Sequence, residues 1–244
     1  MTEVLALPTR RSEEWRYADL DALARVWPLP AREYIDVPAG GSFTRAIVQD
    51  AGGVTQLSVS LGKGATAAVH ILNSGGEYGR IEVDVTLHDG ADFTLGGTQL
   101  GTDDQTLEIV TTVTHAEPNA VSRQIVRSVL GGQSTGTYLG KVAVSRGANG
   151  TDAGQSVRAM LLDRTATANA KPELEIYADD VKCAHGCAVG ELDKQGLFYL
   201  QSRGLTPPQA KRLMLQAFIT EAFVGAEDEG RLSALALAKL EAML

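Results

Sequence analysis

Apolar and polar residues alternate with a period of two over most of the chain between residues 39 and 200. This period is typical of half-buried β-strands. Glycine, asparagine and aspartate pairs separate the alternating segments and predict tight turns. The clearest alternating positions are Ile81, Val83, Val85 and Leu87, then Leu107, Ile109, Thr111 and Val113, then Val142 and Val144, Val157 and Leu161, and Leu174 and Ile176. The pattern predicts a mainly β protein whose core is residues 39–200.

Two β architectures fit this core. Strand onsets recur at roughly every 11 to 15 residues, a short spacing that is typical of all-β folds. An antiparallel sandwich or barrel would need hairpin turns, but few of the breaks have the two-residue Asn-Gly form. A β-solenoid fits the absence of helical crossovers between the strands. Periodicity alone leaves both architectures open.

Residues 1–38 break the alternating pattern and predict a short segment that is partly helical and partly extended. Ser12 can cap a helix that begins with Glu13 and Glu14, where carboxylates suit the positive end of the helix dipole. Prolines at positions 28, 30 and 38 then favour an extended linker to the core.

Residues 201–244 predict a C-terminal helical domain of two helices. Thr206 and Gln209 have the spacing of a capping box, with prolines in the first turn. Gly225 is expected to end the first helix, and the acidic residues 227–229 to begin the second. Such helices can cover the open end of a solenoid, since terminal sheet edges need protection, or they can offer an apolar groove to a partner protein.

Composition and charge narrow the class of protein. The 244 residues are 44% hydrophobic and 21% charged, which is ordinary for a globular chain with one sizeable core. A net charge of -8 argues against nucleic acid and anionic membranes as main partners. The N-terminal residues do not resemble a secretory signal, and no apolar run approaches the roughly 18 residues of a membrane span. Two cysteines make no disulfide framework, so the expected location is the reducing cytoplasm.

The candidate chemistry lies in one short segment, where Cys183, His185 and Cys187 occupy alternate positions. On an extended strand, alternate side chains share one face, with roughly 7 Å between neighbours. Thiolate and imidazole bind zinc, iron and iron–sulfur clusters, but a closed site usually takes four protein ligands and this segment supplies at most three. We therefore expect either completion by another subunit, transient binding, or a structural role as small buried side chains. A redox pair is less favoured, because the familiar motif places two residues between its cysteines.

Longer patterns around this segment resemble those of a known family. The matching segments are Asp179-Asp180-Val181-Lys182-Cys183-Ala184-His185-Gly186, Val189-Gly190-x-Leu192-Asp193, Leu197-Phe198-Tyr199-Leu200-x-Ser202-Arg203-Gly204, Thr151-Asp152-Ala153-x-Gln155, Lys171-Pro172-Glu173-Leu174-Glu175-Ile176 and Glu13-Glu14-Trp15-Arg16-Tyr17. They resemble the SufB/SufD family of iron–sulfur cluster assembly proteins, and the first segment resembles its SufD members in particular. The resemblance is strongest from His115 to Phe223. It implies that the core is a right-handed parallel β-helix.

The resemblance also implies a non-enzymatic scaffold subunit of the SUF system. In this family, SufD pairs with SufB through the β-helices, and the C-terminal helical domains receive SufC, an ABC-type ATPase. By the resemblance, His185 is a candidate ligand, and Cys183 a supporting ligand, of a transient iron or iron–sulfur cluster shared with SufB. Leu213, Phe218 and Phe223 are candidates for the partner-facing surface. Cys187 stands where the family usually has a small residue and receives no role, and a homodimer of the isolated chain is left open.

Two other classes of function remain as alternatives. A polysaccharide lyase built on a β-solenoid would need clustered carboxylates or basic residues on a concave face, and Asp179, Asp180 and Lys182 offer little of this kind. A purely structural solenoid would assemble into filaments, which capping helices at the end of the chain disfavour. No G-x-x-x-x-G-K-[ST] motif occurs, so any ATP hydrolysis would belong to a partner.

Overall fold

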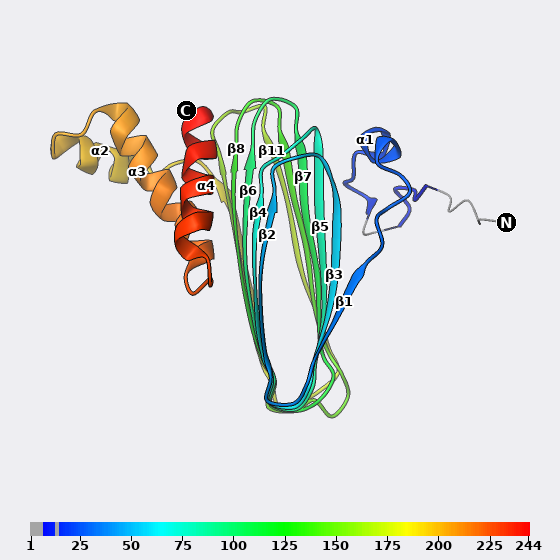
Figure 1. The fold of residues 1–244 in the computed structure, drawn as a ribbon. Helices are drawn as coiled ribbons and strands as arrows, with labels where there is room; N and C mark the ends of the chain where they lie inside the picture. The colour runs from blue at the N-terminus through cyan, green and yellow to red at the C-terminus, as the bar shows by residue number, and fades with distance from the viewer. Residues whose placement is uncertain (1–6, 13–14) are drawn as a thin grey trace.

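The computed structural model describes residues 7–12 and 15–244, and within these ranges twelve strands form two six-stranded sheets (Figure 1). The strands are β1 (Glu33–Val37), β2 (Ser42–Gln49), β3 (Gly53–Leu61), β4 (Thr66–Asn73), β5 (Tyr78–Leu87), β6 (Asp92–Gly101), β7 (Thr106–His115), β8 (Val121–Leu130), β9 (Thr135–Val144), β10 (Asp152–Leu161), β11 (Thr167–Ile176) and β12 (Lys182–Gly190). Odd-numbered strands form one sheet and even-numbered strands the other, which we call the odd sheet and the even sheet. The chain therefore winds as a β-solenoid, and the predicted β-helix class is confirmed.

Each strand pairs in parallel with the strand two places along the chain, so equivalent side chains of successive coils stack in columns. Val59, Val85, Val113 and Val142 form one such column in the odd sheet, and all four are buried. β-Branched side chains stack well on a pleated surface. The alternation in the sequence thus marks the face of each strand that points between the two sheets.

The two ends of the solenoid differ in their inner side chains. At the first end, where β1 and β2 are the edge strands, Arg45 of β2 donates to Glu33 of β1 at 2.6 Å. The Arg45 guanidinium also lies 5.7 Å from the centre of the Phe43 ring. An ion pair therefore spans the opening between the sheets at this end. At the last end, β11 and β12 are the edge strands.

C-terminal helices pack against the outer face of the even sheet (Figure 1). The described residues there form α2 (Lys194–Ser202), α3 (Pro207–Thr220), a 3-10 turn η2 (Glu221–Phe223) and α4 (Glu229–Ala242). The shared apolar cluster joins strand residues to helix residues: Leu72, Leu100 and Val129 with Leu215, Ile219, Phe223, Leu232, Ala236 and Leu240. The helices therefore cover a sheet face and not the open end of the solenoid, because that face carries the apolar partners.

The boundaries of the helical region differ from those expected. Its first helix, α2, begins at Lys194 and not after residue 200, because the Asp193 carboxylate accepts from the backbone amides of Gln195 and Gly196. With α2 included, the described part of the region has three α-helices where two were expected. The predicted capping box is present, and the Gln209 side chain accepts from the Thr206 amide at 2.9 Å. Gly225 follows η2 with a positive φ of 82°, which suits the expected break.

The N-terminal segment packs on the outer face of the odd sheet, opposite the C-terminal helices (Figure 1). Its helix α1 (Leu20–Arg25) is capped by Asp19. Ser12 was expected to cap a helix that begins earlier in the chain. Glu13 and Glu14, the predicted first helical residues, lie outside the described residues. Strand β1 also falls within the 1–38 segment that was expected to be helical and extended. In the described part of the chain, no helix has the length and apolarity that a bilayer crossing needs.

Candidate metal and partner site at the last strand

Strand β12 carries Cys183, His185 and Cys187 on the inner face of the even sheet. In the register with β10 they lie beside Ala153, Gln155 and Val157, whose side chains are buried between the sheets. Cys183 is half-buried and packs against the main core, whereas His185 and Cys187 are exposed. His185 and Cys187 are more exposed than their buried neighbours Gln155 and Val157 because β12 is the edge strand of its sheet, with no further strand beside it among the described residues.

A flat strand does not let both cysteines bind one ion. Their Cα atoms are four residues apart, which corresponds to about 13 Å on an extended strand. A metal lies only about 5 Å from the Cα of a cysteine that binds it, so the two cysteines together reach about 10 Å. His185 with either neighbour can share an ion, and no group of three or more metal-binding side chains occurs among the described residues. The ligand set on β12 is therefore incomplete.

The Cys183 thiol lies in surroundings that favour its neutral form. Burial raises its pKa, the Ala153 backbone hydrogen bond opposes this, and the negative charge of Asp152 raises the pKa further. Asp152 on β10 is thus the acidic neighbour that acts on the thiol. A bound cation would favour release of the thiol proton, because a positive charge stabilises the thiolate.

Both sheets have an open edge at this end of the solenoid. Within the described part of the chain, β12 pairs only with β10, and β11 pairs only with β9. Unpaired backbone groups along an edge strand are a template for pairing with another chain. The strand that carries the Cys and His side chains is therefore also the strand best placed to meet a partner.

The structure corrects the expected partner-facing set on the helices. Phe223 is fully buried between the helices and the even sheet, so its side chain cannot contact a partner. Phe218 is partly buried, with the Arg127 guanidinium 5.8 Å from its ring centre. Leu213 on α3 is 45% exposed, and Phe198 on α2 is 73% exposed. Phe198 and its neighbour Tyr199 were not among the predicted partner-facing residues. Two adjacent aromatic residues in a polar helix are a signal for such a surface.

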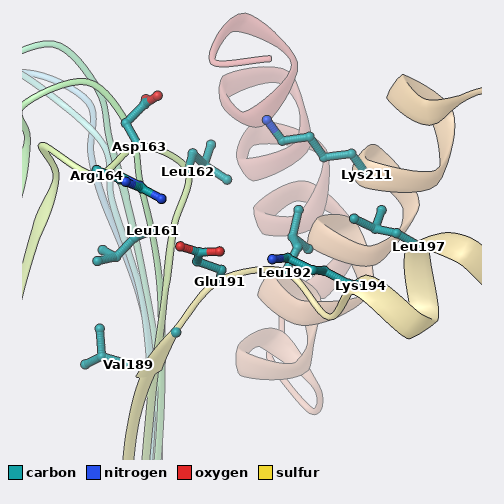
Figure 2. A pocket seen from close by; sticks show the side chains of 11 residues that line it. Leu161, Leu162, Asp163, Arg164, Val189, Glu191, Leu192, Lys194, Leu197 and Lys211 are labelled. Carbon is teal, nitrogen blue, oxygen red and sulfur yellow. The ribbon is translucent and has the colours of Figure 1, made fainter.

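A groove joins the end of β12 to the helices (Figure 2). Its volume is about 560 Å³, and its walls combine apolar side chains with three cations and two carboxylates: Leu161, Leu162, Val189, Leu192 and Leu197 with Arg164, Lys194, Lys211, Asp163 and Glu191. Figure 2 shows side chains from the β10 end, the 191–194 connection and the two helices α2 and α3 around one space. The strand with the candidate ligands and the helical surface thus adjoin through this groove.

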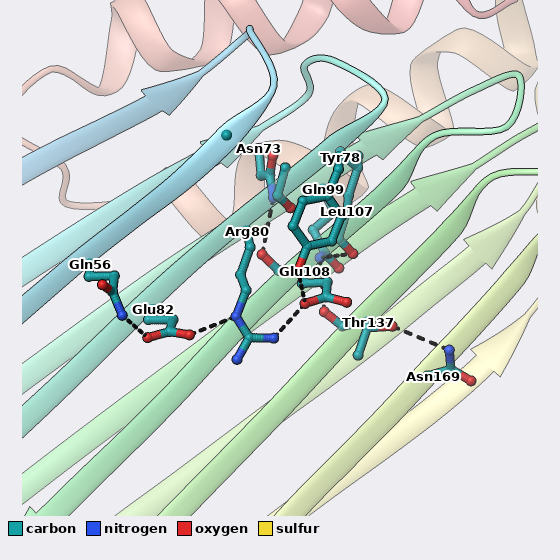
Figure 3. Close-up of polar contacts among 12 residues, drawn as sticks. Gln56, Asn73, Tyr78, Arg80, Glu82, Gln99, Leu107, Glu108, Thr137 and Asn169 are labelled. Carbon is teal, nitrogen blue, oxygen red and sulfur yellow. Dashed lines mark hydrogen bonds and ion pairs between the residues drawn. The ribbon is translucent and has the colours of Figure 1, made fainter. Parts of the chain in front are cut away.

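A second cluster of charged groups lies far from β12, on the outer face of the odd sheet (Figure 3). Arg80 donates to Glu108 at 2.5 Å and to Glu82 at 2.7 Å, and the Trp15 ring centre lies 3.8 Å from its guanidinium. Burial raises the pKa of Glu108, and the charge of Arg80 opposes this. These carboxylates are paired and covered by the N-terminal segment. A polysaccharide lyase would need an accessible cluster, so this one gives that alternative no support.

Comparison with known proteins identifies a protein family whose sequences match this chain. Residues 42–218 match a family model described as SUF system FeS cluster assembly, SufBD core domain. The chain is 36% identical over 152 residues to Protein ABCI7, chloroplastic, of Arabidopsis thaliana, a match that covers 62% of this chain and 32% of that protein. It is 30% identical over 171 residues to the iron-sulfur cluster assembly protein SufD of Escherichia coli, covering 70% and 40% of the two chains. It is 33% identical over 170 residues to the SufBD family protein ML0594 of Mycobacterium leprae, covering 66% and 43%. These matches span between 32% and 43% of the relatives' own length.

Proposed function

The chain belongs to the SufBD core domain family of the SUF system, and from this membership we propose that it is a scaffold subunit, not an enzyme, for iron–sulfur cluster assembly. In this proposal it pairs with a SufB-like subunit through the β11 and β12 end of the solenoid. The nascent cluster is cargo at the interface between the two subunits and is not a resident cofactor of this chain. The working location is the cytoplasm.

The observation that carries the proposal is the position of Cys183 and His185 on an edge strand. A site with its own four ligands would need no partner, whereas β12 offers an incomplete set beside an unpaired sheet edge. Pairing of that edge with another strand would bring the partner's ligands to the same place. His185 is the primary ligand in this arrangement, since it is exposed, and Cys183 is the supporting ligand, since it is half-buried.

The same edge suggests how the chain behaves without a SufB-like partner. Two copies can pair through the same β12 edge in a two-fold arrangement, because an isologous contact uses one surface twice. We propose that such a homodimer forms only when the partner is absent.

The helical region is the proposed docking site for a SufC-like ABC ATPase. Exposed large apolar side chains occur on both helices: Phe198 and Tyr199 on α2, and Leu213 on α3. Phe223 has no part in this contact because it is buried. Docking there would place the ATPase beside the groove that leads to β12, and would couple nucleotide-driven movement to the interface.

The test is anaerobic co-expression with SufB and SufC from the same source. The mass of the complex, its iron and its labile sulfide would be measured for the wild type and for His185→Ala. His88→Ala is the matched control, since His88 is also partly exposed but lies far from β12 and pairs with Glu117. We expect a three-component complex in all cases and loss of most of the iron and sulfide only in His185→Ala. A complex that keeps its cluster in both variants would remove His185 from the site, and failure to form any complex would remove the scaffold role.

A further inference from the structure

A row of buried polar side chains crosses the interior of the solenoid and leads to the edge strand. Thr111 and Tyr138 come from the odd sheet, and Gln124 and Gln155 come from the even sheet. The Gln124 Oε1 accepts from the Thr111 hydroxyl at 3.1 Å, from the Tyr138 hydroxyl at 3.1 Å and from the Gln155 Nε2 at 3.4 Å. Polar side chains in such an interior are costly unless their hydrogen bonds are made. The row is therefore connected through one shared acceptor, the Gln124 Oε1.

Gln155 is the last member of this row, and only one end of its side-chain amide makes hydrogen bonds. Its Nε2 points back to Gln124 and to the Tyr138 hydroxyl, each at 3.4 Å. Its Oε1 is buried and has no hydrogen-bond partner among the described residues, and Gln155 as a whole is 4% exposed. The Gln124 Nε2 in the same row is also buried without a partner among these residues. A buried acceptor without a donor is rare in folded proteins, and each case asks for an explanation.

The register names the neighbour of this open acceptor. Gln155 pairs with Gln124 on one side and with His185 on the other, and all three lie on the inner face of the even sheet. Neighbouring strands are about 4.8 Å apart, a distance over which one side-chain amide reaches the next. Because the Gln155 Nε2 is used toward Gln124 and Tyr138, its Oε1 is the atom that remains for a donor from β12. An imidazole N–H is the donor that His185 can supply there.

We propose that Gln155 is a positioning residue for His185: the His185 ring turns inward from its exposed position, and a ring N–H donates to the open Gln155 Oε1. This hydrogen bond fixes the tautomer and orientation of the imidazole. The other ring nitrogen then carries no proton, and it faces the open end of the solenoid. A metal-binding histidine commonly has its second nitrogen held in this way. The interaction with metal cargo rests on the proposed function, whereas the hydrogen bond itself does not.

The hydrogen bond is tested in the isolated full-length chain. With ¹⁵N-labelled histidine, long-range ¹H–¹⁵N correlation spectra at a pH where His185 is neutral report its tautomer, and His185→Ala identifies its signals. We expect one dominant tautomer in the wild type, a mixture in Gln155→Met, and one dominant tautomer again in Gln155→Glu, which keeps an acceptor. Thr111→Val is the matched control, because it removes a donor from the same network without touching the Gln155 Oε1. An unchanged tautomer ratio in Gln155→Met, or an equal change in Thr111→Val, would overturn the assignment.

The consequence for metal is tested separately in the complex with SufB and SufC. Iron affinity, measured by competition against a chelator, is expected to fall about 10-fold in Gln155→Met and to stay unchanged in Thr111→Val. If the tautomer shifts but the affinity does not, the hydrogen bond stands and its contribution to metal binding is overturned. If His185→Ala removes iron while Gln155→Met changes neither readout, the proposed function stands and Gln155 is not a positioning residue.

Discussion

Gly96 controls how closely the C-terminal helices approach the solenoid. It lies on β6 in the even sheet, and a Cβ atom at this position would be 1.8 Å from the Ala222 carbonyl oxygen and 2.8 Å from the His70 ring. An ordinary contact of this kind needs about 3.5 Å, so the η2 segment would have to retreat by roughly 1.7 Å. The obstructing atom belongs to the backbone, and a side-chain rotation cannot relieve the clash.

The cost of Gly96→Ala follows from what that movement disturbs. Phe223, in the same 3-10 turn, is fully buried against the even sheet. Overpacking alone costs about 1–3 kcal/mol, and complete loss of a buried Phe costs about 3–5 kcal/mol. Since the movement loosens Phe223 without exposing it fully, we expect Gly96→Ala to lower the free energy of unfolding by about 2–4 kcal/mol.

Urea unfolding followed by circular dichroism measures this change. Gly154→Ala is the matched control, because Gly154 is also a glycine of the even sheet and its Cβ would meet the Arg123 side chain at an ordinary 3.5 Å. The control is expected to stay within about 0.5 kcal/mol of the wild type. Equal stability of the two variants would show that the helices do not depend on close approach at Gly96, and would refute the reasoning.

Two buried titratable groups give further predictions. Burial lowers the pKa of His115 to about 4, below its ordinary value of 6.5. The unfolded chain therefore binds the proton more readily between these values, so the free energy of unfolding should fall by about 3 kcal/mol as the pH drops through this window. Urea titrations at several pH values should show this loss in the wild type and not in His115→Gln, and equal pH dependence would contradict it. Glu108→Leu should lower the free energy of unfolding by about 3 kcal/mol, because buried Arg80 loses one of its carboxylate partners. Thermal unfolding measures this against Glu77→Leu, which breaks an exposed pair with Arg25, and similar melting temperatures for the two variants would contradict the prediction.

The sequence pattern predicted the β core because a strand with one buried face keeps its period of two. It could not decide between a sandwich and a solenoid, because the alternation of Val85 with its neighbours says nothing about which strand lies beside it. The answer depends on columns such as Val85 beside Val113, which join residues about one coil apart in the chain. The family resemblance supplied what the periodicity lacked.

The roles of Phe223 and Gln155 were missed for one physical reason: each depends on packing neighbours that the sequence does not reveal. Phe223 was expected to face a partner because a helical apolar stripe does not reveal what it packs against. The even sheet presents Leu72, Leu100 and Val129 on its outer face, so the stripe is already covered. Gln155 was not singled out by itself, since a polar residue inside the core becomes meaningful only when the register shows His185 beside it.

The unlike ends of the solenoid limit how many copies can join. Contact between unlike ends repeats without limit and builds a filament, whereas contact between like ends stops at two. At the first end, a stacked copy would cover the Arg45–Glu33 pair and take both charges out of water, which is costly. The last end has cysteine and histidine on the inner face of its even-sheet edge. End-to-end stacking of copies is therefore opposed at the first end only. This asymmetry favours pairs over fibres, although both sheets have an open edge at each end of the solenoid.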